Sequence, residues 1–169
     1  MLSSLIIKNI LLIDLVELEF KKGLNTLTGE TGAGKSILLD CLGFVLGWNN
    51  SSDLVREGAE VGEVIAEFTI TNNREVSSVL EESGISLSDN IIIRRMINTV
   101  ENRKRNFIND KTVSLDLIRR ISKHLVELQG QAGNQILLSE QCHIDILDNF
   151  AGLSSRILEL QKLWKERQR

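Results

Sequence analysis

The alternation of hydrophobic and polar residues predicts a mixture of short strands and amphipathic helices. In residues 12–20, Val16 and Leu18 share one face of a strand while Glu17 takes the other, so one side of that strand faces water. Strands are predicted at residues 2–7, 12–20, 24–27, 64–70, 90–97, 105–108 and 124–128. Helices are predicted at residues 36–46, 74–83, 115–122, 139–150 and 153–169, the third with Ser114 as its N-cap.

The last predicted helix carries an apolar seam that continues towards Arg169. The seam consists of Leu153, Ile157, Leu160, Leu163 and Trp164. Fewer than three heptads are visible, so the pattern fits either the start of a coiled coil or a simple amphipathic helix. We therefore predict one compact domain over residues 1–150, followed by the start of a coiled-coil helix over residues 151–169.

The composition supports a compact domain and argues against several classes of protein. The chain has 169 residues, 42% of them hydrophobic, and its formal net charge of -3 is unlike that of a polycation that coats nucleic acid. Lys8 and Asp14 interrupt the apolar N-terminus before the roughly 18 residues that a membrane span needs, so no membrane association is expected. Cys41 and Cys142 lack metal-site spacing and predict free thiols in a reducing cytosol.

The segment GETGAGKS at residues 29–36 has the G-x-x-x-x-G-K-S spacing of a phosphate-binding P-loop, between a predicted strand and a predicted helix. Its glycines let backbone N–H groups wrap around phosphate oxygens. Lys35 places a cation against the β and γ phosphates, and Ser36 offers a hydroxyl to Mg²⁺. The predicted cradle comprises Gly29, Glu30, Thr31, Gly32, Ala33, Gly34, Lys35 and Ser36. The loop alone does not distinguish ATP from GTP.

Hydrolysis by P-loop enzymes also needs an acidic residue at the end of a hydrophobic strand to hold Mg²⁺. After Ser36, no run of four apolar residues ends in Asp or Glu, and DILDN at residues 145–149 belongs to a helical pattern. The chain alone is therefore expected to bind nucleotide far better than it hydrolyses it.

Together with its neighbouring segments, the P-loop resembles the N-terminal part of the RecN family, SMC-like DNA repair proteins of bacteria. The likeness follows the family's order through LSSLIIKNILLIDLVELEFKKGLNTLTGETGAGKSILLDCLGFVLG, SSDLVREGAE, IIIRRMI, RKRNFIND, LVELQGQAGNQILL and the helix that begins at residue 153. The resemblance implies an α/β P-loop NTPase fold with a mixed sheet, the N-terminal lobe of an ABC/SMC-type ATPase head. In such heads a long antiparallel coiled coil leads to a C-terminal lobe, which supplies the acidic strand and the signature loop.

The same resemblance implies ligands, partners and location. ATP with Mg²⁺ is sandwiched between two heads of a homodimer, so the chain is an ATPase only when a C-terminal lobe completes it. DNA is the expected partner, held without sequence specificity during double-strand break repair and recombination. The expected location is the bacterial cytoplasm, at the nucleoid if the protein acts on DNA.

The resemblance also implies a catalytic and metal-binding role for Gln131, which matches the family's Q-loop glutamine near Mg²⁺ and the attacking water. Gln129 and Gln135 are competing candidates, and a polar strand-end residue bonded to its own loop is the alternative interpretation. The histidines that usually flank this glutamine are replaced by Gln129, Ala132 and Asn134, which do not titrate near neutrality.

Arg56 in DLVREG resembles a family arginine near the nucleotide, where a guanidinium reaches phosphate. A surface ion pair with Glu57 or Glu60 is the alternative. The preceding GWNNSS lacks the arginine expected after the family's paired glycines, which predicts weaker nucleotide affinity than in close relatives.

Two basic clusters lie on or beside adjacent predicted strands: Arg94 and Arg95, and Arg103, Lys104 and Arg105. They are interpreted either as one face that meets DNA phosphates or as a solvated charged face. The acidic net charge, and the lack of a nearby aromatic residue other than Phe107, favour the second interpretation.

Three functions therefore stay open. The first is the ATP-binding lobe of a RecN-like ATPase, and the second is a self-sufficient P-loop kinase or GTPase, which predicts turnover by the isolated chain. The third is a degenerate or truncated fragment that serves as a non-catalytic interaction module, which predicts no nucleotide binding.

Overall fold

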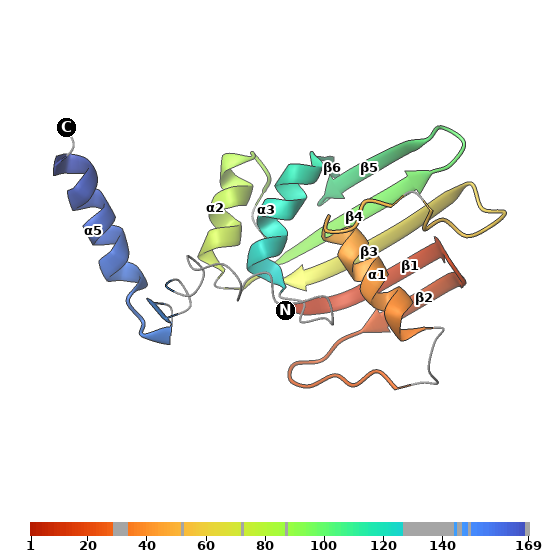
Figure 1. Cartoon of the computed structure of the whole chain (residues 1–169), viewed down its shortest axis with the longest axis horizontal. Helices are drawn as coiled ribbons and strands as arrows, with labels where there is room; N and C mark the ends of the chain where they lie inside the picture. Colours follow the sequence, from red (N-terminus) through yellow and green to blue (C-terminus); the bar gives the residue numbers. More distant parts are fainter. Residues whose placement is uncertain are drawn as a thin grey trace. The chain divides into compact units, whose positions relative to one another are not determined.

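A computed structural model of the chain describes residues 1–28, 34–51, 53–71, 73–86, 88–126, 144, 147, 148 and 150–167 (Figure 1). The chain separates into two compact units, Met1–Glu127 and Leu128–Arg169. Within the described residues, no helix is long and apolar enough to cross a membrane.

A six-stranded sheet forms the centre of the first unit (Figure 1). Its strands are β1 (Leu2–Ile10), β2 (Ile13–Glu19), β3 (Val61–Thr69), β4 (Asn90–Asn98), β5 (Arg103–Ile108) and β6 (Lys111–Thr112). In space they follow the order β2-β1-β3-β4-β5-β6, and every neighbouring pair is antiparallel. At the centre, Val64 of β3 lies opposite Ile7 of β1 and Arg95 of β4.

Alternation along the strands gives the sheet one buried face, the core face, and one more exposed face, the outer face. In β3, Val64 and Phe68 are buried, whereas Glu63 and Glu67 remain partly exposed, as the sequence predicts for Glu67. The buried hydrophobic residues of β1, β3, β4 and β5 belong to a single cluster with those of the helices. The period-two pattern therefore sets which side of the sheet receives the helices.

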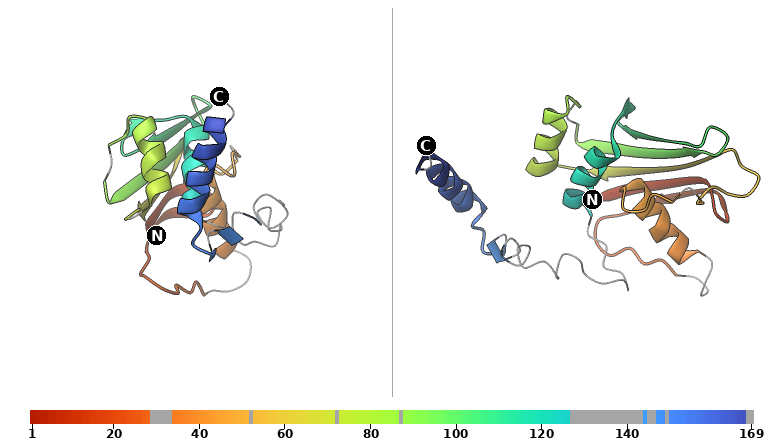
Figure 2. Two further views of the ribbon diagram at one scale, coloured as in Figure 1. Left: turned by 90° about the vertical axis from the view of Figure 1, so that its left-hand side faces the viewer. Right: turned by 45° about the horizontal axis from the view of Figure 1, so that its top comes forward.

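Three helices accompany the sheet: α1 (Lys35–Val45), α2 (Arg74–Glu82) and α3 (Leu115–Leu125). α1 contacts β3, β4 and β1, and α3 contacts β5 and α2; Figure 2 shows α2 and α3 side by side. The predicted N-cap is confirmed, because Ser114 Oγ accepts a hydrogen bond from the N–H of Leu117 at 3.2 Å. All three helices were predicted within a few residues of their ends.

The mixed sheet predicted from the sequence is not seen among the described residues, whose strand pairs are all antiparallel. The strand predicted at residues 24–27 is absent, and Leu24 is 95% exposed. Asn25 instead makes local hydrogen bonds with the backbone of Lys21, at 3.0 and 2.7 Å. An apolar segment becomes a strand only when a neighbouring strand satisfies its backbone groups, and no described strand lies beside this one.

The strand predicted at residues 124–128 is wrong at its start, because α3 continues through His124 and Leu125. Helical spacing from Ile118 and Ile121 places Leu125 against the core, so packing overrides the short apolar run. Val126 is extended and ends the helix. The sequence also missed β6, which follows a tight turn in which Asn109 and Asp110 both have positive φ.

The second unit contains α5 (Ser154–Arg167), and residues 144, 147, 148 and 150 are also helical. Leu160, Leu163 and Trp164 are exposed on α5, so the helix and its apolar seam are as predicted. The boundary predicted between residues 150 and 151, where a coiled coil would begin, stays a prediction.

Candidate nucleotide site

The start of α1 carries the described part of the predicted cradle. Gly34 is the N-cap residue and makes no side-chain cap hydrogen bond, and Lys35 and Ser36 follow it on the exposed first turn. The N–H groups of a first turn lack partners within the helix and lie at the positive end of its dipole, which favours an anion there. Gly29, Glu30, Thr31, Gly32, Ala33 and Gln131 lie outside the described residues.

The two ends of α1 differ in burial. Residues 34–40 are exposed or partly exposed, whereas residues 41–47 are buried in the core of the first unit. Cys41 marks the change, and burial, followed by the charge of Asp40, raises the pKa of its thiol to about 12. The buried residues 41–45 therefore form the base of α1, and its exposed first turn is the predicted phosphate-binding end.

Arg56 lies beside the hairpin that joins β1 and β2. Its backbone N–H donates to the carbonyl of Asn9 at 3.0 Å, and the adjacent Val55 forms a bridge with Ile10. Its guanidinium pairs with Asp14 at 3.3 Å. Arg56 therefore does make a surface ion pair, but its partner is Asp14 and not Glu57 or Glu60. Both side chains are substantially exposed, so the pair is expected to contribute at most about 1 kcal/mol to stability.

The hairpin beside Arg56 has a fixed shape. Asn9 and Leu11 both have positive φ, and the side chain of Asn9 donates to the carbonyl of Val61 at 3.1 Å. Gly62 permits this approach, because a Cβ there would lie 2.8 Å from Ile10 Cδ1 and 3.0 Å from the oxygen of Asn9. The position of Arg56 is thus set by close backbone packing.

The structure corrects the interpretation of the basic clusters as one face. Arg95 is 1% exposed and points to the core face with Ile93 and Ile97. Lys104 lies opposite Ile97 on the same side, where it donates to the carbonyl of Asn50. The period-two pattern of β4 places Arg95 among buried isoleucines, and this signal was available in the sequence.

Arg94 points to the outer face, where much of the basic charge is paired. Glu63 lies 3.4 Å from Arg94 and 3.7 Å from Lys8, and the guanidinium of Arg94 lies 4.3 Å from the centre of the Phe107 ring. Arg105 pairs with Glu101 at 3.2 Å. The outer face is therefore less basic than the sequence suggested.

No group of three His, Cys, Asp or Glu side chains gathers to hold a metal in the part of the chain that the structure describes. Mg²⁺ ligation by Ser36 and Gln131 accordingly stays a prediction. The contact between Arg56 and the nucleotide likewise stays a prediction.

The GETGAGKS motif leading into α1 against a β-sheet defines the class of P-loop nucleotide-binding domains. A family model described as an AAA domain matches residues 4–169, and the chain belongs to this family. Membership supports nucleotide binding.

The chain is similar to bacterial DNA repair proteins named RecN. It is 37% identical to RecN of Bacillus subtilis (strain 168) over 152 residues, which cover 90% of this chain and 26% of that protein. For RecN of Rickettsia felis the identity is 37%, with 98% and 30% covered, and for RecN of Haemophilus influenzae it is 34%, with 99% and 31% covered. The resemblance to RecN is confirmed, and the chain spans less than a third of these relatives.

Solved structures confirm the fold. An SMC head bound to the C-winged helix domain of ScpA matches with a TM-score of 0.61 at 24% identity, covering 73% of this chain and 40% of that one. The ATP complex of the recombination mediator RecF matches with a TM-score of 0.51 at 19% identity, covering 67% and 27%. The prediction of an SMC-type ATPase head lobe is therefore confirmed as to fold.

Proposed function

We propose that this chain is the ATP-binding lobe of a RecN-like ATPase that acts in repair of DNA double-strand breaks. The observation that carries the proposal is the exposed first turn of α1, where Lys35 and Ser36 follow directly from a P-loop sequence. The similarity to RecN over nearly the whole chain supplies the repair context.

In this proposal Lys35 contacts the β and γ phosphates, and Ser36 ligates Mg²⁺. Gln131 completes the metal site from its own loop, and Arg56 exchanges Asp14 for a phosphate. The metal neutralises charge on the phosphates, while the protein supplies the cradle and the orientation.

Hydrolysis is assigned to a larger assembly. After Ser36 the sequence contains no run of four apolar residues that ends in Asp or Glu, and the chain spans 26% to 31% of its RecN relatives. We therefore propose that a C-terminal lobe and a second head complete the site, in a homodimer that holds DNA in the bacterial cytoplasm.

Calorimetry of the 169-residue chain with Mg-ATP tests the proposal. The unmutated chain should bind, and Lys35→Ala should weaken binding by at least about tenfold, since it removes a charge-assisted contact to phosphate. Lys123→Ala, which removes an exposed lysine of α3, is the matched control and should leave affinity unchanged. No heat of binding at millimolar Mg-ATP would reject the proposal and favour a non-catalytic interaction module.

A further inference from the structure

Cationic side chains donate hydrogen bonds to the base of α1 and to the loop that follows it. Arg95 of β4 extends beneath the C-terminal end of the helix and donates to the carbonyl of Phe44. The same guanidinium donates to the carbonyl of Asn49 at 3.2 Å and to Asn50 Oδ1 at 2.9 Å. Its Nε donates to Asn106 Oδ1 at 2.8 Å, so all three of its nitrogens are bonded.

Two further cations reach the same stretch of backbone. Arg119 of α3 donates from Nε to the carbonyl of Gly47 at 2.9 Å, and Lys104 of β5 donates to the carbonyl of Asn50. Gly47 has a φ of +79°, and a Cβ there would lie 3.1 Å from both Arg119 Cγ and Leu115 Cδ1. The loop at residues 47–50 thus packs closely against α3 and accepts hydrogen bonds from side chains of β4, β5 and α3.

Electrostatics explains why cations occupy these positions. The last carbonyls of a helix lack partners within it and form the negative end of its dipole. Burial, followed by the charge of Arg119, lowers the pKa of Arg95 to about 10, so Arg95 stays charged at neutral pH. The two arginines repel each other, and hydrogen bonds offset this repulsion: Arg95 donates to Phe44 at the end of α1, and Arg119 donates to Gly47 in the loop that follows.

The arrangement matters for the opposite end of α1. In residues 34–40, Ile37 and Leu38 pack partly against the core and the others are exposed, so the direction of the 11-residue helix is fixed mainly at its buried base. A helix of this length extends about 16 Å, so a small tilt at the base displaces the first turn by an ångström or more. Displacements of that size at a positioned group weaken binding and chemistry substantially.

We propose that Arg95, Arg119 and Lys104 are positioning residues for the nucleotide site, which aim the first turn of α1, with Lys35 and Ser36, at the phosphates. The inference rests on the proposed function, because it requires that this turn bind Mg-ATP. The three residues act through α1 and touch no phosphate themselves.

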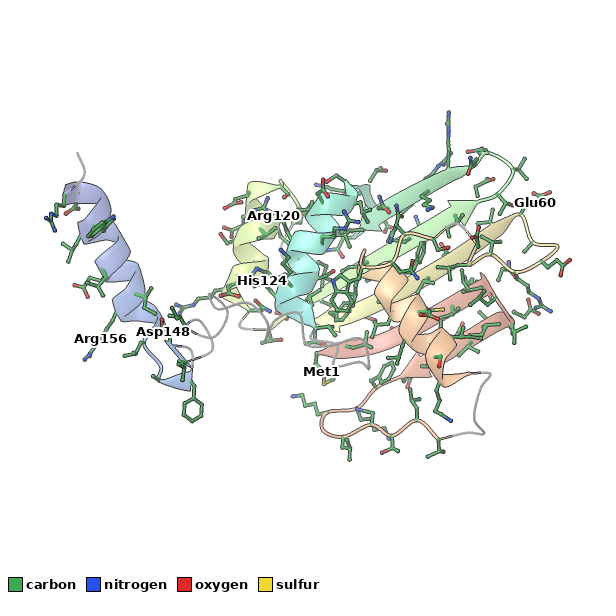
Figure 3. All side chains as sticks on the ribbon, in the orientation of Figure 1. Met1, Glu60, Arg120, His124, Asp148 and Arg156 are labelled. Carbon is green, nitrogen blue, oxygen red and sulfur yellow. The ribbon has the colours of Figure 1, made fainter. Side chains whose placement is uncertain are left out.

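Arg119→Met tests the inference, because Arg119 is half exposed and its loss should leave the chain folded. Arg120→Met is the matched control: Arg120 is the next residue of α3 (labelled in Figure 3), and its guanidinium makes an exposed ion pair with Glu82 of α2 at 3.2 Å. Affinity for Mg-ATP and the free energy of unfolding in urea are measured for both variants. A second pair, Lys104→Met against Arg103→Met, repeats the comparison on β5.

Arg119→Met should weaken Mg-ATP binding by about three- to tenfold, whereas Arg120→Met should change it less than twofold. Arg119→Lys should restore most of the affinity, since an ammonium can still donate to the carbonyl of Gly47. In a Trp164→Phe background, emission from Trp48 reports on the loop directly, because Trp48 is the remaining tryptophan. Its emission should shift in Arg119→Met and not in Arg120→Met.

Equal affinities for Arg119→Met and Arg120→Met, with binding by the unmutated chain intact, would overturn the inference and leave the proposed function standing. Absence of binding by the unmutated chain would overturn both. A loss of affinity that merely follows the loss of folding stability across all four methionine variants would show a structural role only, and would also overturn the inference.

Discussion

Arg94 and Arg95 are adjacent in the sequence, yet each guanidinium stacks on a different phenylalanine on opposite faces of the sheet. Arg94 lies 4.3 Å from the centre of the Phe107 ring on the outer face, and Arg95 lies 4.2 Å from that of Phe44 on the core face. The same residue type therefore makes a partly exposed contact at one position and a buried structural one at the next.

Methionine at these two positions should have unequal effects on stability. Arg95→Met removes a buried guanidinium with its four hydrogen bonds, and should lower the free energy of unfolding by about 3 kcal/mol. Arg94→Met removes a partly exposed ion pair with Glu63 and should cost less than about 1 kcal/mol. Urea denaturation followed by circular dichroism measures both, and equal costs would contradict the assignment of Arg95 to the core face.

Alanine at two glycines should act in opposite directions. Gly62→Ala brings a Cβ to 2.8 Å from Ile10 Cδ1 and should destabilise the chain by about 1–3 kcal/mol. Gly43→Ala has no atom of another element within 4 Å and lies inside α1, so it should stabilise by up to about 1 kcal/mol. Thermal unfolding of the two variants measures both effects. An unchanged unfolding temperature for Gly62→Ala would contradict the close packing of Gly62 against Ile10 and Asn9.

The thiol of Cys41 should be unreactive in the folded chain. Its pKa of about 12 leaves almost no thiolate at pH 8, and the side chain is fully buried. Because the folded pKa exceeds the reference value of 9.0, the stabilisation by the neutral thiol is complete below pH 9 and declines as pH rises towards 12. In a Cys142→Ser background, a thiol reagent should label Cys41 only after urea unfolding, and rapid labelling without urea would contradict its burial.

Contact with DNA, if made by the outer face, should depend on Arg103 and Arg105. Reversing both charges to glutamate should reduce the slope of log affinity against log salt by about 2, since each arginine that neutralises a phosphate contributes about 1. Reversing Arg120 and Lys123 on α3 is the control and should leave the slope unchanged. If the salt dependence is unchanged when Arg103 and Arg105 are reversed, the outer face does not bind DNA.

Local pattern predicted the elements that bury a single face, because the period of the pattern marks that face. The period-two alternation of β1 to β5 and the helical spacing of α1, α2 and α3 are satisfied inside the first unit. The segment at residues 24–27 was misread, because its apolar pattern predicts a strand but says nothing of which strand would pair with it. Strand formation there depends on tertiary contacts, which a local pattern does not contain.

The candidate site was predictable to the extent that its chemistry follows from a contiguous motif. Lys35 and Ser36 lie at the start of a helix, as the P-loop sequence requires. The pairing of Arg56 with Asp14 joins residues 42 positions apart in the sequence and depends on the shape of the hairpin at Asn9. The role of Arg95 was missed because its charge suggested a surface, although its strand position indicated the core.

The bonds at the base of α1 have a consequence for how this chain tolerates sequence change. Arg95, Arg119 and Lys104 mostly donate to main-chain carbonyls, those of Phe44, Gly47, Asn49 and Asn50. A carbonyl is present whatever side chain it carries, so a substitution at Asn49 keeps the bond from Arg95 and loses only the bond that Asn49 Oδ1 accepts from the N–H of Ser51. Changes at positions 48 and 49 therefore keep the main-chain acceptors at the base of α1, whereas Gly47, with its positive φ, and Asn50, whose Oδ1 accepts from Arg95, are constrained.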